Sequence, residues 1–265
     1  MKTIWLVVPC YNEEEVLPET SRQLKAVMNS MIERGKISPE SKITFVNDGS
    51  KDGTWDIISS LCAEESLFAG INLSRNRGHQ NALLAGLMTA KKYADAAISL
   101  DADLQDDVDV VEKMVDNFLA GDDIVYGVRS SRKTDTFFKR FTAEGFYKFM
   151  AAMGVEIVFN HADYRLMSRR ALEALSEFEE VNLFLRGIVP QIGFKTSTVE
   201  YERKERLAGE SKYPLKKMIS FAFEGITSFS VKPLKMATTL GIFSLIVCFA
   251  MIIYCIAVSY THLRA

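Results

Sequence analysis

Short apolar runs alternate with amphipathic segments through the first half of the chain. The apolar runs are bounded by polar turn residues and predict strands, whereas the segments between them carry apolar residues at helical spacing. The predicted strands cover residues 4–8, 43–46, 69–73, 96–100 and 124–128, and the predicted helices cover 14–34, 54–65, 81–93 and 108–119. This alternation predicts an α/β fold, with a mostly parallel sheet covered by helices on both faces.

The pattern changes after residue 129. An aromatic-rich helix is predicted over 137–153. Two short strands are predicted over 163–167 and 196–201, with a helix over 170–178 between them. The following segment, 214–229, is amphipathic, with Lys216 and Lys217 beside apolar positions. Such a segment suits either an interfacial helix on a membrane or a helix packed against the preceding domain.

The carboxyl-terminal part is uniformly apolar. Residues 236–260 contain no Asp, Glu, Lys or Arg, and about 20 such residues are enough to cross a bilayer as a helix. The alternative, a buried core helix, is rare at this length in small soluble domains. Lys232 and Lys235 precede the run, which by the positive-inside rule places the preceding domain on the cytoplasmic side of the inner membrane. The predicted organisation is a cytoplasmic domain, an amphipathic helix and a transmembrane helix, over 1–213, 214–235 and 236–260.

Composition narrows the class of protein. A chain of 265 residues with 48% hydrophobic residues can form one sizeable domain and an additional element. A net charge of −2 and a pI near 6.0 argue against nucleic-acid binding. Cys10, Cys62, Cys248 and Cys255 lack the spacing of a zinc site or a disulfide framework, which fits a reducing environment.

Polar segments follow four of the predicted strands, at 9–14, 47–53, 74–81 and 101–107. Each segment alone is consistent with a turn or a helix cap. The carboxyl ends of parallel strands meet at one edge of a sheet, however, where open α/β sheets bind ligands. Together the segments offer an aromatic face, hydrogen-bond acceptors, a helix start that favours anions and closely spaced carboxylates. This combination predicts a site for a sugar nucleotide.

Asp101 and Asp103 are the most informative residues in these segments. Paired carboxylates suit Mg²⁺ or Mn²⁺, which usually bridges to substrate phosphates. The alternative is an acidic loop in which Asp106 or Asp107 caps the following helix. Because this run is expected at the same sheet edge as the three other segments, a metal–diphosphate site is favoured. In this interpretation Asp103 is the direct metal ligand, Asp101 lies nearer the nucleotide and Gln105 assists at the metal site.

The motifs in these segments resemble glycosyltransferase family 2. They are Val8-Pro9-Cys10-Tyr11-Asn12-Glu13-Glu14, Val46-Asn47-Asp48-Gly49-Ser50-Lys51-Asp52-Gly53-Thr54, Asn76-Arg77-Gly78-His79-Gln80-Asn81-Ala82 and Asp101-Ala102-Asp103-Leu104-Gln105-Asp106. The chain is most similar to the polyprenyl-phosphate branch, which includes dolichyl-phosphate mannose synthases and bactoprenol glucosyltransferases. The likeness continues through 163–167 and 201–213. It implies a GT-A fold and inverting chemistry. Because the bacterial branch commonly has two carboxyl-terminal membrane helices, we expect the chain to stop before a second one; a homo-oligomer is compatible with this pattern.

The resemblance also implies roles for single residues. Those that match nucleotide-sugar-binding positions are Pro9, Tyr11, Glu13, Asp48, Asn76, Asp101, Asp103 and Gln105, and the last three match the metal site. The residues that match positively charged groups around the donor and lipid phosphates are Arg129, Arg203, Arg206, Ser211 and Lys212. The last four are interpreted as part of a mobile lid that closes on phosphates, and the alternative is a solvated basic loop. Asp163 matches an acidic residue near the acceptor, where it either orients the substrates or acts as general base. The expected catalytic residues are Asp163, Asp103 and Arg206.

These features predict a membrane-anchored glycosyltransferase that moves glucose from UDP-glucose to undecaprenyl phosphate. Alternatives with the same chemistry use GDP-mannose or a UDP-amino sugar as donor. An alternative of another class is a non-catalytic, membrane-tethered subunit that binds sugar nucleotides. A processive polysaccharide synthase is less favoured, because the chain has no Gln-x-x-Arg-Trp motif and Trp occurs only as Trp5 and Trp55.

Overall fold

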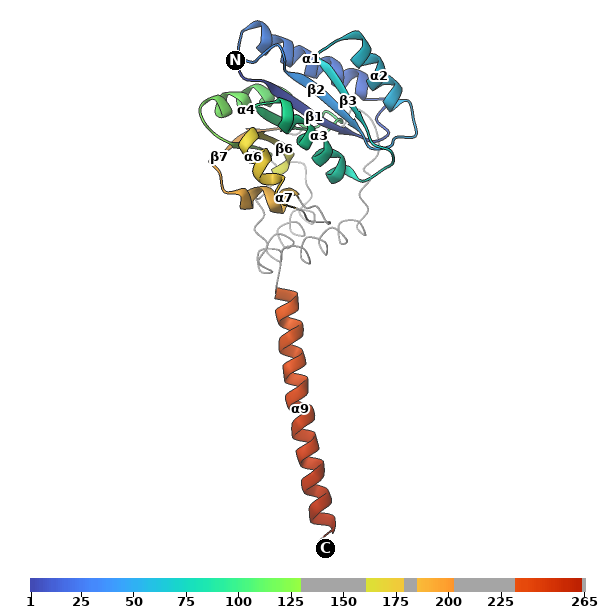
Figure 1. Cartoon of the computed structure of the whole chain (residues 1–265), viewed down its shortest axis with the longest axis vertical. Coiled ribbons are helices and arrows are strands. Elements are labelled where there is room, and N and C mark those ends of the chain that lie inside the picture. The colour runs from blue at the N-terminus through green and yellow to red at the C-terminus, as the bar shows by residue number, and fades with distance from the viewer. Residues whose placement is uncertain (130–160, 179–184, 203–231, 264–265) are drawn as a thin grey trace.

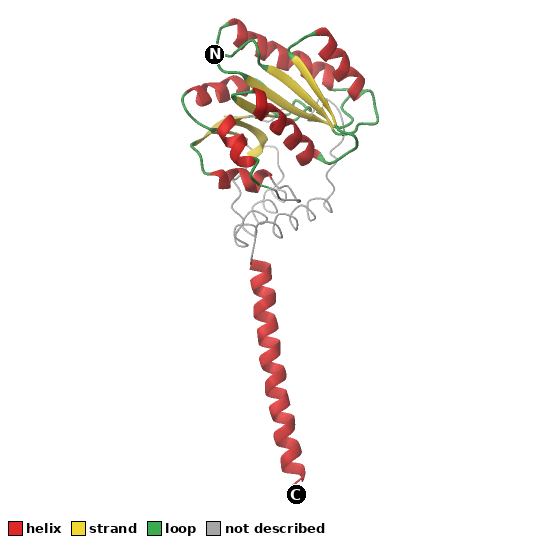
Figure 2. Cartoon of the chain, viewed as in Figure 1, coloured by secondary structure: helices red, strands yellow, loops and turns green. Residues whose placement is uncertain are grey.

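The computed structural model describes residues 1–129, 161–178, 185–202 and 232–263 (Figure 1). Several predictions lie outside these residues: the helices over 137–153 and 214–229, and the lid residues Arg203, Arg206, Ser211 and Lys212. The described part has a sheet domain followed by one long helix (Figure 2).

The sheet has seven strands in the order β3-β2-β1-β4-β6-β5-β7. The strands are β1 (Ile4–Cys10), β2 (Lys42–Asn47), β3 (Phe68–Asn72), β4 (Ala96–Ser99), β5 (Ile124–Arg129), β6 (His161–Ser168) and β7 (Thr196–Tyr201). All neighbouring pairs are parallel except those that involve β6, which is antiparallel to both β4 and β5. The prediction of a mostly parallel sheet is confirmed.

Helices cover both faces of the sheet, as predicted. The helices are α1 (Leu17–Glu33), α2 (Thr54–Glu64), α3 (His79–Tyr93), α4 (Val110–Leu119), α6 (Arg169–Leu175) and α7 (Leu185–Ile188), with a 3₁₀ helix η1 (Val189–Ile192). Side chains of β1 alternate between two apolar cores. Ile4, Leu6 and Val8 pack with α1, α2 and α4, whereas Trp5 and Val7 pack with α3, α6 and α7. Because β1 is buried on both faces, its sequence is a continuous apolar run.

Close packing holds α3 against the centre of the sheet. Gly86 of α3 faces β1 and β2, and a Cβ atom on it would lie 2.3 Å from Val7 Cγ1 and 2.9 Å from Val46 Cγ2. Only a residue without a side chain allows this approach. The contact fixes the start of α3, at His79, relative to the strand ends.

The insertion of β6 between β4 and β5 is the main feature that the sequence pattern does not predict. Ser99 of β4 pairs with Arg165 of β6 in antiparallel register. The start of β6 therefore lies at the same edge as the end of β4, which brings Asp163 next to the loop that follows β4. Pairing between distant segments is a tertiary property, and local hydrophobic periodicity carries no information on it.

The long helix α9 (Lys232–Leu263) projects away from the sheet domain (Figure 1). Residues Leu234–Tyr260 have a mean hydropathy of 2.7, and none of this segment is buried within the described protein. The helix is long and apolar enough to cross a membrane by length and composition. It contains the predicted span 236–260, and the last four residues of the predicted amphipathic segment form its first turn.

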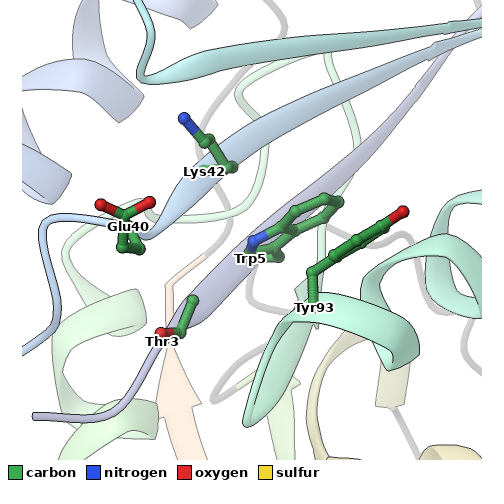
Figure 3. Close-up of a pocket in the computed structure, with 5 residues that line it drawn as sticks. All are labelled: Thr3, Trp5, Glu40, Lys42 and Tyr93. Carbon is green, nitrogen blue, oxygen red and sulfur yellow. The ribbon is translucent and has the colours of Figure 1, made fainter.

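A hollow of about 460 Å³ lies at the amino edge of the sheet, where β1 and β2 begin (Figure 3). Its lining residues are Thr3, Trp5, Glu40, Lys42 and Tyr93. The rings of Trp5 and Tyr93 stack with their centroids 5.5 Å apart. None of the predicted site residues lines this hollow.

Candidate active site

The loops after β1 and β2 are joined by hydrogen bonds into one rim. Asn12 has a φ of +53°, a left-handed conformation that Asn tolerates better than most residues. Its backbone N–H donates to Ser50 Oγ at 3.0 Å, and its side-chain oxygen accepts from Lys51 N at 2.9 Å. Glu13 N donates to Thr54 Oγ1 at 2.9 Å. The rim holds the predicted nucleoside residues Tyr11 and Glu13, with Tyr11 exposed and Glu13 half-buried; Pro9, by contrast, is buried within β1.

Asp48 joins the loop after β2 to the loop after β3. Its buried carboxylate accepts from Arg77 N at 2.6 Å and from Gly78 N at 2.9 Å. Gly49, with a φ of +65°, allows the loops to touch, because a Cβ atom on it would lie 2.5 Å from Asn76 N. Asp48 thus holds the loop that carries the exposed Asn76; contact of either residue with a nucleoside stays a prediction.

The acidic run after β4 is held in a strained conformation. Leu104, between Asp103 and Gln105, has a φ of +54°, which costs a residue with a side chain roughly 1–2 kcal/mol. Thr20 Oγ1 of α1 donates to Ala102 O at 2.6 Å, and Gln105 N donates to Asp103 Oδ1 at 3.2 Å. Strained residues persist where surrounding contacts fix them, and they are frequent at functional sites.

Aromatic residues from β6 and β7 fix the far end of this run. Tyr201 Oη donates to Asp106 Oδ1 at 2.5 Å, and Tyr164 Oη donates to Asp107 O at 2.9 Å. Arg129 Nε donates to Tyr201 Oη at 3.4 Å, and its Nη2 lies 3.6 Å from Asp106 Oδ1. Asp106 therefore anchors the loop to β5 and β7. The structure places Arg129 in this anchor, and its predicted contact with a substrate phosphate stays a prediction.

Asp163 is the centre of a second charged cluster at the same edge. Asp163 is 6% exposed. It accepts from Arg165 Nη2 at 2.5 Å, from Arg186 Nη2 at 3.1 Å and from Gln80 Nε2 at 3.2 Å. Burial by itself would raise the pKa of Asp163, but the positive charges of Arg186 and Arg165 outweigh that effect and hold the pKa well below its usual range. The contacts with Arg165, Arg186 and Gln80 fix the position of the carboxylate, and both an orienting role and general-base work stay predictions.

His79 lies between the two clusters. Its Nε2 is 3.6 Å from Asp101 Oδ1 and 3.8 Å from Asp163 Oδ2. Since the two distances sum to 7.4 Å, those carboxylate oxygens are no farther apart than that. The predicted metal–diphosphate residue Asp101 and the predicted acceptor residue Asp163 are therefore brought together.

Three other carboxylates act on the charge of Asp101. Its pKa is raised to about 6, first because the protein displaces water from the carboxylate and then because Asp106, Asp163 and Asp103 repel its charge, while His79 acts in the opposite direction. The side chain keeps 40% of its surface exposed, so a ligand can reach it. A cation at this position would relieve the repulsion.

The donor set fits a divalent cation that also binds substrate phosphates. Among the residues that the structure describes, no group of three or more His, Cys, Asp or Glu side chains is placed to hold a metal ion. Mg²⁺ is commonly held by one or two carboxylates together with substrate phosphates, and Asp101 and Asp103 supply two carboxylates. Gln105 is largely buried, and its role as a ligand stays a prediction.

Four residues of the site had no predicted role: His79, Gln80, Arg165 and Arg186. The sequence does contain a signal that could have identified Arg165. Asp163 and Arg165 share one face of a predicted strand, and a buried charge needs a partner. His79 and Gln80 lie in a predicted polar segment, but only the fold brings them to Asp163. No local pattern indicates Arg186.

The sheet topology and the acidic run at its carboxyl edge are those of a GT-A glycosyltransferase. The fold is similar to that of mannosyl-3-phosphoglycerate synthase from Rubrobacter xylanophilus, with a TM-score of 0.55 and 13% identity over 89% of this chain and 75% of that one. It is also similar to glucosyl-3-phosphoglycerate synthase from Mycobacterium tuberculosis, with a TM-score of 0.52 and 14% identity over 85% of this chain and 76% of that one. These two structures support the fold.

The family follows from the sequence comparisons. The model of glycosyl transferase family 2 matches residues 5–176, and the chain belongs to this family. It is 57% identical to the uncharacterized glycosyltransferase YkoT of Bacillus subtilis, over 89% of this chain and 70% of that protein. It is 42% identical to the bactoprenol glucosyl transferase of Shigella phage SfV, over 91% of this chain and 76% of that protein. The predicted family is confirmed, and the protein is a glycosyltransferase.

Proposed function

We propose that this glycosyltransferase moves glucose from UDP-glucose to undecaprenyl phosphate at the cytoplasmic face of a membrane. The observation that carries the proposal is the approach of Asp101 and Asp163 to within 7.4 Å at one sheet edge, with His79 between them. A predicted acidic site for a metal-bound diphosphate then adjoins the predicted acceptor residue Asp163, which two arginines hold. The 42% identity to a bactoprenol glucosyl transferase supports both the acceptor and the sugar.

The donor side consists of the rim and the acidic run. Tyr11, Glu13 and Asp48 contact the nucleoside in this proposal, and Asp101 and Asp103 bind the metal that accompanies the diphosphate. The similar synthase from M. tuberculosis was solved with Mn²⁺ and UDP. Bound Mg²⁺ or Mn²⁺ offsets the negative charge that develops on the leaving diphosphate. Asp103 is fixed by its bond from Gln105 N, so its carboxylate is oriented before the substrate arrives.

The acceptor side requires positioning more than proton transfer. A lipid phosphate is already an anion near neutral pH, so its oxygen can attack the anomeric carbon without a base. The new bond joins that oxygen to the carbon, while the bond between the carbon and the diphosphate breaks and UDP leaves with the electron pair. Attack on the face opposite the leaving group inverts the configuration. Asp163 keeps its negative charge throughout, in agreement with its low pKa.

Helix α9 supplies a reason for a lipid acceptor. A long polyprenyl tail stays in the bilayer, so an enzyme that acts on its phosphate gains from being held at the surface. Leu234–Tyr260 is long enough to span the hydrocarbon core. Lys235, at the start of this segment, favours the cytoplasmic side for the sheet domain.

A donor panel on membranes that contain the full chain tests the proposal. Labelled UDP-glucose, GDP-mannose and a UDP-amino sugar are each incubated with undecaprenyl phosphate and Mg²⁺ or Mn²⁺, with a chelator as control. We expect lipid-linked sugar from UDP-glucose, dependent on the metal. Preference for another donor would contradict the assignment of glucose, and the absence of lipid-linked sugar from every donor would contradict the proposed reaction.

A further inference from the structure

Every second side chain of the acidic run is buried in the core beneath it. Leu100, Ala102 and Leu104 belong to the apolar core that α1, α2 and α4 cover. Asp101 and Asp103, which alternate with them, are half-buried. The two carboxylates are therefore presented by a backbone segment that is packed against the domain, and their positions depend on the conformation of that backbone.

This backbone is strained at Leu104, whose φ is +54°. The left-handed conformation is unfavourable for a residue with a Cβ atom, and it persists only where surrounding contacts hold it. Leu104 follows Asp103 directly in the chain, so a change in its dihedral angles would reorient the peptide that joins the two residues. The position of Asp103 therefore depends on the contacts that fix the run on both sides of Leu104.

The contact before Leu104 comes from Thr20 of α1. Thr20 is fully buried, and its Oγ1 lies 2.6 Å from Ala102 O and 3.0 Å from Val16 O. A hydroxyl has a single proton to donate, and the shorter contact is the one with Ala102. Since Ala102 lies between Asp101 and Asp103, this bond ties the centre of the pair to a helix on the face of the sheet.

The contact after Leu104 comes from Tyr201, the last residue of β7. Its Oη donates to Asp106 Oδ1 at 2.5 Å and accepts from Arg129 Nε at 3.4 Å. Arg129 ends β5 and pairs with Tyr201 in the sheet register. The ring of Tyr201 also lies edge-on to that of Tyr164 of β6, with centroids 5.4 Å apart. The hydroxyl is thus held by the ends of three strands, and the ring has packing contacts that do not depend on it.

We propose that Thr20 and Tyr201 are positioning residues of the metal–diphosphate site, which hold the acidic run in the conformation in which Asp101 and Asp103 bind a divalent cation. The proposal rests on the proposed function, because that function supplies the metal-bound diphosphate. Neither hydroxyl touches the metal or the substrate. Each acts through the run, and ligands that are held before binding lose less entropy when the cation arrives.

The test removes each hydroxyl with little change of shape, in the full chain. Tyr201→Phe keeps the ring and its contact with Tyr164, Thr20→Val keeps the branched side chain, and Thr20→Ser keeps the hydroxyl. Tyr93→Phe is the matched control, because it removes the same atom at the amino edge of the sheet, where Tyr93 is exposed. Binding of Mn²⁺ in the presence of UDP is measured in detergent from the electron paramagnetic resonance signal of free Mn²⁺. The Mn²⁺ concentration for half-maximal sugar transfer and the Michaelis constant for undecaprenyl phosphate are measured in parallel.

We expect Tyr201→Phe and Thr20→Val each to weaken Mn²⁺ binding about 10-fold or more, as for the loss of a group that orients metal ligands. The Mn²⁺ concentration for half-maximal transfer should rise by a similar factor, and saturating Mn²⁺ should restore most of the rate. The Michaelis constant for undecaprenyl phosphate should not change. Thr20→Ser and Tyr93→Phe should bind Mn²⁺ like the wild type.

The outcomes separate this inference from the proposed reaction. If the wild type transfers glucose and both Tyr201→Phe and Thr20→Val bind Mn²⁺ as tightly as the wild type, the inference is wrong and the reaction stands. If no sugar is transferred but both variants weaken Mn²⁺ binding, the inference stands and the reaction is wrong. A loss in only one variant would overturn the role of the other residue. Should Tyr201→Phe fail to fold in a thermal unfolding assay, the Thr20 variants decide, and equal losses in Thr20→Val and Thr20→Ser would count against the hydroxyl.

Discussion

Both edges of the sheet hold an aspartate paired with arginine, but the surroundings of the two pairs differ. At the amino edge, Asp123 accepts from Arg170, whose side chain is mostly in solvent. At the carboxyl edge, Asp163 accepts from the fully buried Arg165 and from the half-exposed Arg186. One carboxylate thus neutralises one arginine at the first edge and faces two at the second. The buried partner Arg165 distinguishes the carboxyl edge, which is where the strand-end loops converge.

The backbone shows the same difference. At the carboxyl edge, Leu104 has a left-handed conformation and Gly49 lies against the backbone of the neighbouring loop. At the amino edge, the stacked rings of Trp5 and Tyr93 form part of the lining of the hollow (Figure 3). The left-handed residues other than glycine that the structure describes, Asn12 and Leu104, both lie at the carboxyl edge. The following variants compare the two edges directly.

The largest loss of stability is expected for Asp163→Asn. The substitution leaves Arg165 buried without its charged partner, and breaking a buried ion pair costs about 3–5 kcal/mol. The free energy of unfolding, measured in detergent on the full chain, should fall far more than in Asp123→Asn, since Arg170 becomes solvated when its partner is removed. Equal losses in the two variants would show that the edges do not differ in this way.

A substitution of Gly49 by Ala should be the next most destabilising. The new Cβ would meet Asn76 N at 2.5 Å and would also require a left-handed backbone, a combined cost of about 2–4 kcal/mol. Gly193→Ala is the matched control, because Gly193 has a φ of +77° but the atom that its Cβ would meet, Gln191 O, would lie 3.9 Å away. Thermal unfolding should show the greater loss in Gly49→Ala. A loss no larger than in Gly193→Ala would mean that the two loops separate easily.

Asp123→Asn should have a smaller effect that depends on pH. The hydrogen bond and charge of Arg170 lower the pKa of Asp123, despite partial burial. The ionised form therefore stabilises the fold, by about 1–2 kcal/mol, at pH values above the ordinary aspartate pKa of about 3.9. This contribution is lost as the pH falls through the lowered pKa. The difference in unfolding free energy between wild type and Asp123→Asn should be greatest above about pH 5 and shrink below about pH 4; a constant difference would argue against the ion pair.

Tyr93→Ala should have the smallest effect. It removes one ring of a stacked pair, worth roughly 0.5–1.5 kcal/mol, at the edge opposite the proposed chemistry. We expect a small decrease in the unfolding temperature and wild-type rates of sugar transfer. A strong decrease in transfer at a temperature where the variant is folded would assign a function to the amino edge.

Much of the fold could be predicted from the sequence, because buried strands and amphipathic helices leave local patterns. The predicted strand 96–100 and the observed β4 (Ala96–Ser99) differ by one residue, and the acidic run follows it as expected. The position of β6 could not be predicted, since it depends on pairing between Ser99 and Arg165, far apart in the chain.

The candidate site was predictable to a similar extent. The acidic run was predicted from its position after a strand and Asp163 from the resemblance to the family, and the structure brings Asp101 and Asp163 close together. The alternative in which Asp106 caps the following helix is wrong. The carboxylate of Asp106 instead accepts a hydrogen bond from Tyr201 of a distant strand. Arg186 lies outside every predicted element, and only the folded chain places it beside Asp163.

The most direct test of the central claim is the rate of lipid-linked glucose formation by Asp103→Asn compared with Asp109→Asn. Asn keeps an oxygen that accepts from Gln105 N, so the loop should remain folded while one carboxylate is lost from the metal site. Asp109 is exposed at the start of α4 and its side chain makes no capping bond there. We predict that Asp103→Asn lowers the rate about 1,000-fold or more, whereas Asp109→Asn stays near the wild-type rate. A near-wild-type rate for Asp103→Asn would contradict the assignment of the carboxyl edge as the site of sugar transfer.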